Sequence, residues 1–301
     1  MIIAPSASTN ASKHDYQHID VRPLTGALGA EIFNVKVNDL SPAELLEIKQ
    51  AQADHGVVFF RDQTLSIEEQ EAFTLNFGDF GIDPYVPGIE GHPHVLRLIK
   101  EADEATGYVF GGAWHSDWSF QEAPPSFTIL YGSDIPDYGG DTMFANLYQA
   151  YDMLSPEMQR LCESLNVIHS ARLGYAPASA GIHSLYENME VIASDDAMDI
   201  QVHPMVVEHP VTGRKLLYIT GVYSIGIEGM HQDEADALLN FLKSQIEHPI
   251  NTCRFRWEQG SIAMWDNRCA LHLPMGDYHG LRREMYRTTV AGAKPIAATN
   301  K

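Results

Sequence analysis

Apolar and polar positions follow two periods along the chain, and together they predict strands with helices inserted between them. Helical spacing follows the capping residues Ser41 and Ser66 and recurs over residues 146–162 and 231–246. A strand, a turn and a second strand are expected over residues 19–37. Further short alternating or fully apolar runs are typical of strands, at residues 56–60, 94–99, 127–131, 202–207, 216–223, 253–257, 261–265 and 286–291. This order predicts a mainly β protein with inserted helices and a jelly-roll core.

The size of the chain is compatible with one domain. It has 301 residues, of which 45% are apolar, enough to form a large core. Barrels and sandwiches of this length occur as single units, so we expect one domain over residues 19–301. Residues 1–18 are polar and rich in Ser, Ala and His, and we expect a flexible tail there. No run approaches the roughly 20 apolar residues that a membrane-spanning helix needs.

The net charge and the number of cysteines limit which partners and which cellular compartment are expected. The formal net charge is −20 with histidine neutral, which disfavours nucleic acid and anionic membrane surfaces as partners. A small organic substrate is expected instead, and an anionic one requires a local cationic site. Cys162, Cys253 and Cys269 are widely spaced and form neither a disulfide framework nor a cysteine-rich zinc site. A reducing cytoplasm is therefore favoured, and we further expect a homo-oligomer.

Residues 113–120 (AWHSDWSF) carry the first candidate chemistry. Their Trp, Phe and Ser content is typical of a strand, in which side chains two residues apart share a face. His115 and Asp117 would then converge on one point, with Ser116 pointing away. A third ligand from elsewhere would complete a facial metal triad. The alternative is a hydrogen-bonded pair without a metal.

Residues 173–199 are irregular and contain glycine, proline, serine and an acidic patch at residues 194–196. An unstructured loop of this length is uncommon in a compact domain and is often a lid or a binding loop. Disorder is the alternative, and the sequence leaves both open.

Three further stretches follow residues 115–117, namely 139–142 (GGDT), 265–272 (WDNRCALH) and 281–287 (LRREMYR). In this order the four stretches resemble the taurine dioxygenase/TfdA family of Fe(II)- and 2-oxoglutarate-dependent oxygenases. The likeness includes residues 23–31 (PLTGALGAE) and 59–62 (FFRD), and it extends from about residue 21 to residue 292. It implies a double-stranded β-helix, which agrees with the jelly roll that the hydrophobic pattern predicts.

The resemblance also implies the metal and its chemistry. His115, Asp117 and His272 match the iron ligands of the family. Two imidazoles and a carboxylate on one face of Fe(II) leave three positions open, two for 2-oxoglutarate and one for O2. The expected products are a hydroxylated substrate, succinate and carbon dioxide.

Three residues are assigned to the cosubstrate by the same resemblance. Thr142 and Arg283 match the residues that hold the distal carboxylate of 2-oxoglutarate. A planar, always-charged guanidinium suits that role better than an ammonium group, and the threonine hydroxyl adds a neutral donor. Arg287 matches an arginine near the metal-binding end of the cosubstrate and the acidic group of the primary substrate. Its even offset from Arg283 predicts that both side chains face the barrel interior.

The primary-substrate pocket departs from that of the members that oxidise taurine. Those members carry histidine, tyrosine, asparagine and phenylalanine in the places of Asp83, Val86, Gly111 and Ala171. The smaller residues predict a wider pocket, in which Asp83 receives a cationic or hydroxylated group. An aromatic wall is kept at Tyr223. We therefore expect a small to medium organic acid, such as a sulfonate, sulfate ester or aryloxyalkanoate, and expect taurine to be a poor substrate.

Other functions stay open at this point. One is a barrel that binds a small acid or metal without turnover, a second is a metal hydrolase, and a third is a true taurine dioxygenase. The first two have no need of Arg283, which favours the oxygenase. Trp265 is expected in the barrel core, and Arg268 and Arg282 in salt bridges rather than in the site.

Overall fold

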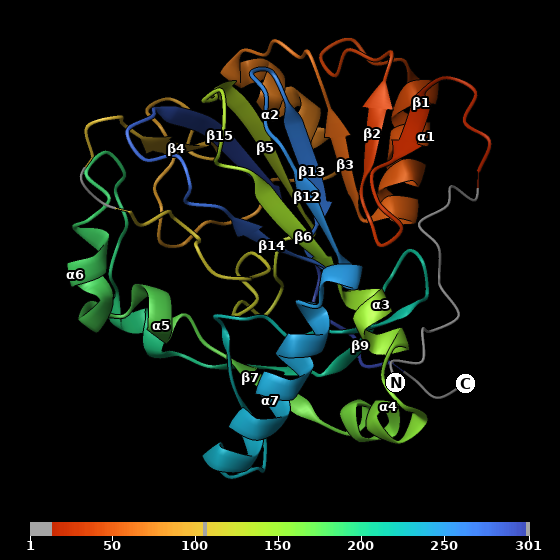
Figure 1. Ribbon diagram of the computed structural model, residues 1–301, viewed down its shortest axis with the longest axis vertical. Helices are drawn as coiled ribbons and strands as arrows, with labels where there is room; N and C mark the ends of the chain where they lie inside the picture. Colours follow the sequence, from red (N-terminus) through yellow and green to blue (C-terminus); the bar gives the residue numbers. More distant parts are fainter. Residues whose placement is uncertain (1–13, 105–106, 299–301) are drawn as a thin grey trace.

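The computed structural model describes residues 14–104 and 107–298. A seven-stranded sheet forms the largest part of the barrel, in the order β1–β2–β3–β13–β5–β15–β4 (Figure 1). Its neighbouring strands are antiparallel, except for β2 and β3, which are parallel. The strands are β1 (Asp20–Pro23), β2 (Ala30–Phe33), β3 (Val57–Phe60), β4 (Leu96–Lys100), β5 (Phe127–Asp134), β13 (Ile262–Asp266) and β15 (Arg283–Val290).

A three-stranded sheet packs against one face of the large sheet and closes the barrel. It has the order β12 (Thr252–Phe255), β6 (Thr142–Asn146) and β14 (Ala270–Pro274). Phe59 of the large sheet stacks on Phe255 with ring centroids 4.0 Å apart, and it meets Phe144 edge to face at 5.6 Å. Buried residues of both sheets form one core cluster there. The predicted double-stranded β-helix is confirmed.

Two smaller sheets extend the fold beyond the barrel. One joins β11 (Ser224–Ile227), β7 (Asn166–His169) and β8 (Gln201–Pro204), and the other is a hairpin of β9 (Val206–Glu208) and β10 (Lys215–Leu217). The strand predicted over residues 216–223 is too long, because it ends at Leu217 and the chain turns before β11.

Helices α1 (Pro42–His55) and α2 (Ile67–Leu75) cover the outer face of the large sheet. Both predicted capping boxes form, with Ser41 and Ser66 as N-caps. Ile48 of α1 and Phe73 of α2 pack into the core behind that sheet. The other helices are α3 (Leu147–Asp152), α4 (Pro156–Glu163), α5 (Arg172–Tyr175), η1 (Pro177–Ser179), α6 (Ala180–His183), η2 (Asp195–Met198), α7 (Gln232–Ile246) and η3 (Pro249–Asn251).

The structure differs from the predictions at the N-terminal end and in the segment at residues 173–199. The tail expected over residues 1–18 is partly outside the described residues, which begin at His14. Residues 14–18 are anchored on α1 rather than free, since Tyr16 donates to Asp54 and the amides of residues 17 and 18 donate to Glu47. The irregular segment at 173–199 forms short helices instead of an unstructured loop.

The strand predicted over residues 113–120 is wrong. His115 makes only an isolated bridge to His272, and the chain turns at Asp117. Trp118 has a left-handed backbone with φ of 49°, a conformation that a strand excludes. The β-propensity of Trp and Phe reflects burial against neighbours, and here a buried turn provides that burial.

Candidate active site

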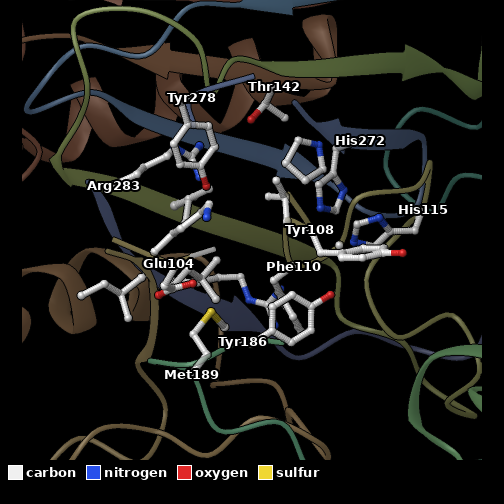
Figure 2. A pocket seen from close by; sticks show the side chains of 18 of the residues that line it. Glu104, Tyr108, Phe110, His115, Thr142, Tyr186, Met189, His272, Tyr278 and Arg283 are labelled. Carbon is white, nitrogen blue, oxygen red and sulfur yellow. The ribbon is translucent and has the colours of Figure 1, made fainter. Parts of the chain in front are cut away.

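Three metal-ligand side chains meet at the mouth of the barrel, as the sequence predicts. His115 and His272 form an isolated antiparallel bridge, in which their backbones exchange hydrogen bonds of 3.0 and 2.8 Å. The turn after His115 carries Asp117 back toward them. Its Oδ1 lies 3.7 Å from Nε2 of His115 and 3.9 Å from Nε2 of His272. Figure 2 shows the two imidazoles side by side above the cavity.

The protonation of the two histidines suits metal binding. Nδ1 of His115 lies 2.7 Å from the carbonyl oxygen of Ala113, which assigns the proton to Nδ1 and leaves the Nε2 lone pair facing Asp117. Burial lowers the pKa of His115 and, more strongly, that of His272. Both imidazoles are therefore neutral near pH 7, as a metal ligand must be.

Asp117 is held by residues to which the sequence analysis gave no role. Thr128 donates to its Oδ2 at 2.6 Å, and Asn267 donates to the threonine hydroxyl at 2.8 Å. The Asn267 side-chain oxygen also accepts from the Asp117 amide at 3.2 Å. Burial raises the pKa of Asp117, but the charge of Arg287 and the hydrogen bond from Thr128 act against it, and that pKa is lowered overall. The carboxylate is thus ionised, and its Oδ1, which faces both histidines, accepts only a long hydrogen bond of 3.4 Å from Arg287.

This donor set fits Fe(II). The three ligand atoms lie within 4.8 Å of one another, and all three side chains are buried. Two imidazole nitrogens and one carboxylate oxygen on one side are the ligands of a facial iron site. Trp265, expected in the core, is buried with its ring 4.5 Å from that of His272, and its indole donates to Asn267.

A carboxylate pocket opens beside the triad. Arg283, on β15, is buried, and its Nη2 donates to the carbonyl oxygen of Gly140 at 3.0 Å. Its Nε has no hydrogen-bond partner among the described residues. Trp257 donates to the hydroxyl oxygen of Thr142 at 2.9 Å, which leaves the threonine proton free to donate elsewhere. Thr142, Tyr278 and Arg283 converge on the same cavity as the histidines (Figure 2).

Arg287 lies deeper, between two carboxylates. Its Nη1 is 3.4 Å from Oδ1 of Asp117, and its Nη2 is 2.9 Å from Oδ1 of Asp83. Burial lowers the pKa of Arg287, but these two carboxylates raise it overall, so the guanidinium stays charged. Like Arg283, it lines the cavity and faces the barrel interior.

Three of the residues that were expected to shape a wide substrate pocket lie away from this cavity. Val86, Ala171 and Tyr223 are buried in an aromatic cluster that includes Trp118 and Tyr175, and they do not line the cavity. Large neighbouring rings therefore take the space that small residues would leave.

Gly111 lines the cavity, but it has a different reason to be small. Its φ is 74°, and a Cβ there would lie 2.9 Å from Cε1 of His115. Glycine at this position lets the backbone pass beside the metal ligand. It does not add room for a substrate.

The outer part of the cavity is formed by two loops that carry no motif. Tyr108 and Phe110 come from the loop before His115, and Tyr186 and Met189 come from the segment after α6 (Figure 2). Phe110 and Tyr186 meet edge to face at 6.0 Å. The long segment therefore contributes to the cavity wall, which is one of the two roles that the sequence left open.

A second cluster of ligand-type side chains, His209, Asp266 and Cys269, is an ion-pair network rather than a metal site. Nδ1 of His209 accepts from the amide of Thr212, so its Nε2 carries the proton that it donates to Asp266 at 3.0 Å. Arg268 holds both oxygens of that carboxylate. Arg268 is thus in a salt bridge as predicted, and Arg282 pairs with acidic side chains likewise.

None of the helices described here is long and apolar enough to cross a membrane.

The sequence profile of the family described as "Taurine catabolism dioxygenase TauD, TfdA family" matches residues 20–289. The chain is 34% identical over 281 residues to an alpha-ketoglutarate-dependent sulfate ester dioxygenase of Pseudomonas putida, with 92% of this chain and 91% of that protein covered.

Two further comparisons agree. The chain is 29% identical over 280 residues to an (S)-phenoxypropionate/alpha-ketoglutarate-dioxygenase of Sphingobium herbicidovorans, covering 91% of this chain and 95% of that one. It superposes on the crystal structure of a taurine dioxygenase from Burkholderia xenovorans with a TM-score of 0.78 and 32% identity, over 93% and 92% of the two chains. The chain belongs to the TauD/TfdA family of dioxygenases.

Proposed function

We propose that the protein is an Fe(II)- and 2-oxoglutarate-dependent dioxygenase that hydroxylates a C–H bond of a small to medium organic acid. The observation that carries this proposal is the convergence of the ionised Asp117 and two neutral histidines on a cavity that also holds Arg283 and Thr142. Bound iron would supply the oxidation, in which one oxygen atom of O2 enters the product and the other enters succinate.

The side chains of this protein bind and orient the reactants. His115, Asp117 and His272 would hold the metal, with Thr128 and Asn267 fixing the direction of the carboxylate. Hydrogen bonds of this kind keep a ligand oriented before the metal arrives.

The cosubstrate would lie along the cavity, with its distal carboxylate on Arg283. Nε of that guanidinium is without a partner among the described residues, and the Thr142 proton is free, so two donors await one carboxylate. Arg287 would lie beside the other end of the cosubstrate. The walls of the cavity are mostly apolar or aromatic.

The substrate class is supported by the relatives. They are named for a sulfate ester and a phenoxypropionate, which are among the organic acids that we expect. A true taurine dioxygenase is the alternative within the family, supported by the structural neighbour. A cytoplasmic location is also proposed, supported by three buried, unpaired cysteines. A single domain over residues 19–301 and a homo-oligomer remain predictions.

A substrate panel scored by succinate release tests the proposal. Sulfonates, sulfate esters and aryloxyalkanoates are compared, each with Fe(II) and 2-oxoglutarate. At least one acid should raise succinate formation above the substrate-free rate and give a product 16 Da heavier or its breakdown products. A barrel that only binds, or a metal hydrolase, would form no succinate at all.

A further inference from the structure

Asp83 lies where the sequence of taurine-oxidising members has a histidine, and its carboxylate is fully engaged. Trp118 donates to Oδ1 at 2.5 Å, Arg287 donates to the same oxygen at 2.9 Å, and Thr289 donates to Oδ2 at 3.2 Å. The side chains of Asp83 and Arg287 are 6% and 4% exposed. This carboxylate is therefore a fixed, buried partner of the arginine and not an open acceptor for substrate.

The backbone holds Asp83 in this position. The amide of Gly81 donates to the carbonyl oxygen of Thr289 at 2.9 Å, and Phe80 bridges to Val290. A Cβ on Gly81 would lie 2.6 Å from the Thr289 hydroxyl, so only glycine permits this close approach to β15. The left-handed turn at Trp118 directs its indole N–H at the same carboxylate. Three separate elements thus place the aspartate on Arg287.

The pair changes the charge of the site. The site holds two arginines, Arg283 and Arg287, and two carboxylates, Asp83 and Asp117. The two histidines bind a metal as neutral ligands. Lys100 and Glu104 of the cavity wall carry opposite charges that cancel. The side chains of the site therefore carry no net charge. A divalent metal with doubly charged 2-oxoglutarate adds none. A substrate acid group placed here would be a buried charge without a counter-ion, which is unfavourable.

We propose that Asp83 is the specificity-determining residue that keeps acid groups of the primary substrate away from Arg287. The substrate then meets Arg287 with an uncharged part, and any acid group lies at a distance from the oxidised carbon. The inference rests on the proposed function and narrows it. Compact acids such as taurine, in which the acid group is one or two carbons from every C–H bond, are excluded.

The test is anaerobic binding of methanesulfonate, the smallest sulfonate, to protein loaded with Fe(II) and 2-oxoglutarate. The wild type, Asp83→Asn and the control Asp79→Asn, which alters an exposed carboxylate of the same loop, are compared by calorimetry. Removing the buried charge should tighten anion binding by about 10- to 100-fold in Asp83→Asn, because the bound anion would no longer lie near a buried negative charge. Asp79→Asn should match the wild type.

Equal binding of methanesulfonate by the wild type and Asp83→Asn would overturn the inference. A second measurement needs no variant. Methanesulfonate and its uncharged analogue methanesulfonamide are compared as ligands of the wild type, where the uncharged member should bind more tightly. Tighter binding of the sulfonate would contradict the role of Asp83. Loss of Fe(II) or 2-oxoglutarate binding by the wild type would instead refute the proposed function.

Discussion

Replacing Arg283 by alanine should remove most of the affinity for 2-oxoglutarate. The guanidinium is 6% exposed, and its Nη2 is fixed by the Gly140 carbonyl, so the cosubstrate carboxylate would lose a buried and pre-oriented partner. Breaking a buried ion pair costs roughly 3–5 kcal/mol. At about 1.4 kcal/mol per decade, the dissociation constant should rise by about two to four decades. The dissociation constant of Arg283→Lys should lie between those of the wild type and Arg283→Ala, because lysine keeps the charge but loses the bidentate geometry.

The neighbouring Arg282 is the matched control. It is also an arginine on the same strand edge, but its side chain is 33% exposed and pairs with Glu101, Asp134 and Glu284 on the outside. Arg282→Ala should leave 2-oxoglutarate affinity within a fewfold of wild type. Anaerobic titration of the Fe(II)-loaded proteins measures both. Unchanged affinity in Arg283→Ala, or an equal loss in both variants, would refute the anchor role.

Two further predictions concern Thr142, in cosubstrate binding, and Asp266, in stability. Thr142→Val removes one hydrogen bond to a charged group, worth about 1.5–3 kcal/mol, so it should weaken 2-oxoglutarate binding less than Arg283→Ala does; a larger loss would contradict the assignment. Burial raises the pKa of Asp266, but the charge of Arg268 and the hydrogen bonds from His209 and Arg268 together lower it to about 2. Because the folded-state pKa is below the ordinary value near 3.9, the ionised carboxylate contributes about 2–3 kcal/mol of stability above pH 4, which is lost as the pH falls toward 2. Urea unfolding of wild type and Asp266→Asn from pH 7 to pH 3 should show a difference that shrinks with pH, and a constant difference would argue against this ion pair.

The sequence predicts the parts of the molecule whose signal is local or carried by a motif. Both capping boxes form, because the two partners of each box are three residues apart. The barrel follows from apolar strands. The metal triad follows from His115, Asp117 and His272 in their motifs, although a turn rather than a strand brings the first two together.

Contacts between distant residues could not be predicted in the same way. The ion pair between Asp83 and Arg287 spans 204 positions, and the sequence near either residue does not predict it. Asn267 lies within a motif, yet its link to Thr128 requires the pairing of β13 with β5. The wide-pocket prediction depends on distant residues in a related way. Small residues indicate open space only when no distant ring fills it, and Trp118 and Tyr175 do so here.

The central claim is that one Fe(II) and one 2-oxoglutarate bind together at the His115, Asp117 and His272 site. Anaerobic addition of 2-oxoglutarate to the protein with Fe(II) should give a weak visible charge-transfer band that saturates at one equivalent per chain. The variant with both His115→Ala and Asp117→Ala should give no band and should bind iron far more weakly. A wild-type protein without the band, or a double variant that binds iron as tightly as wild type, would contradict the account.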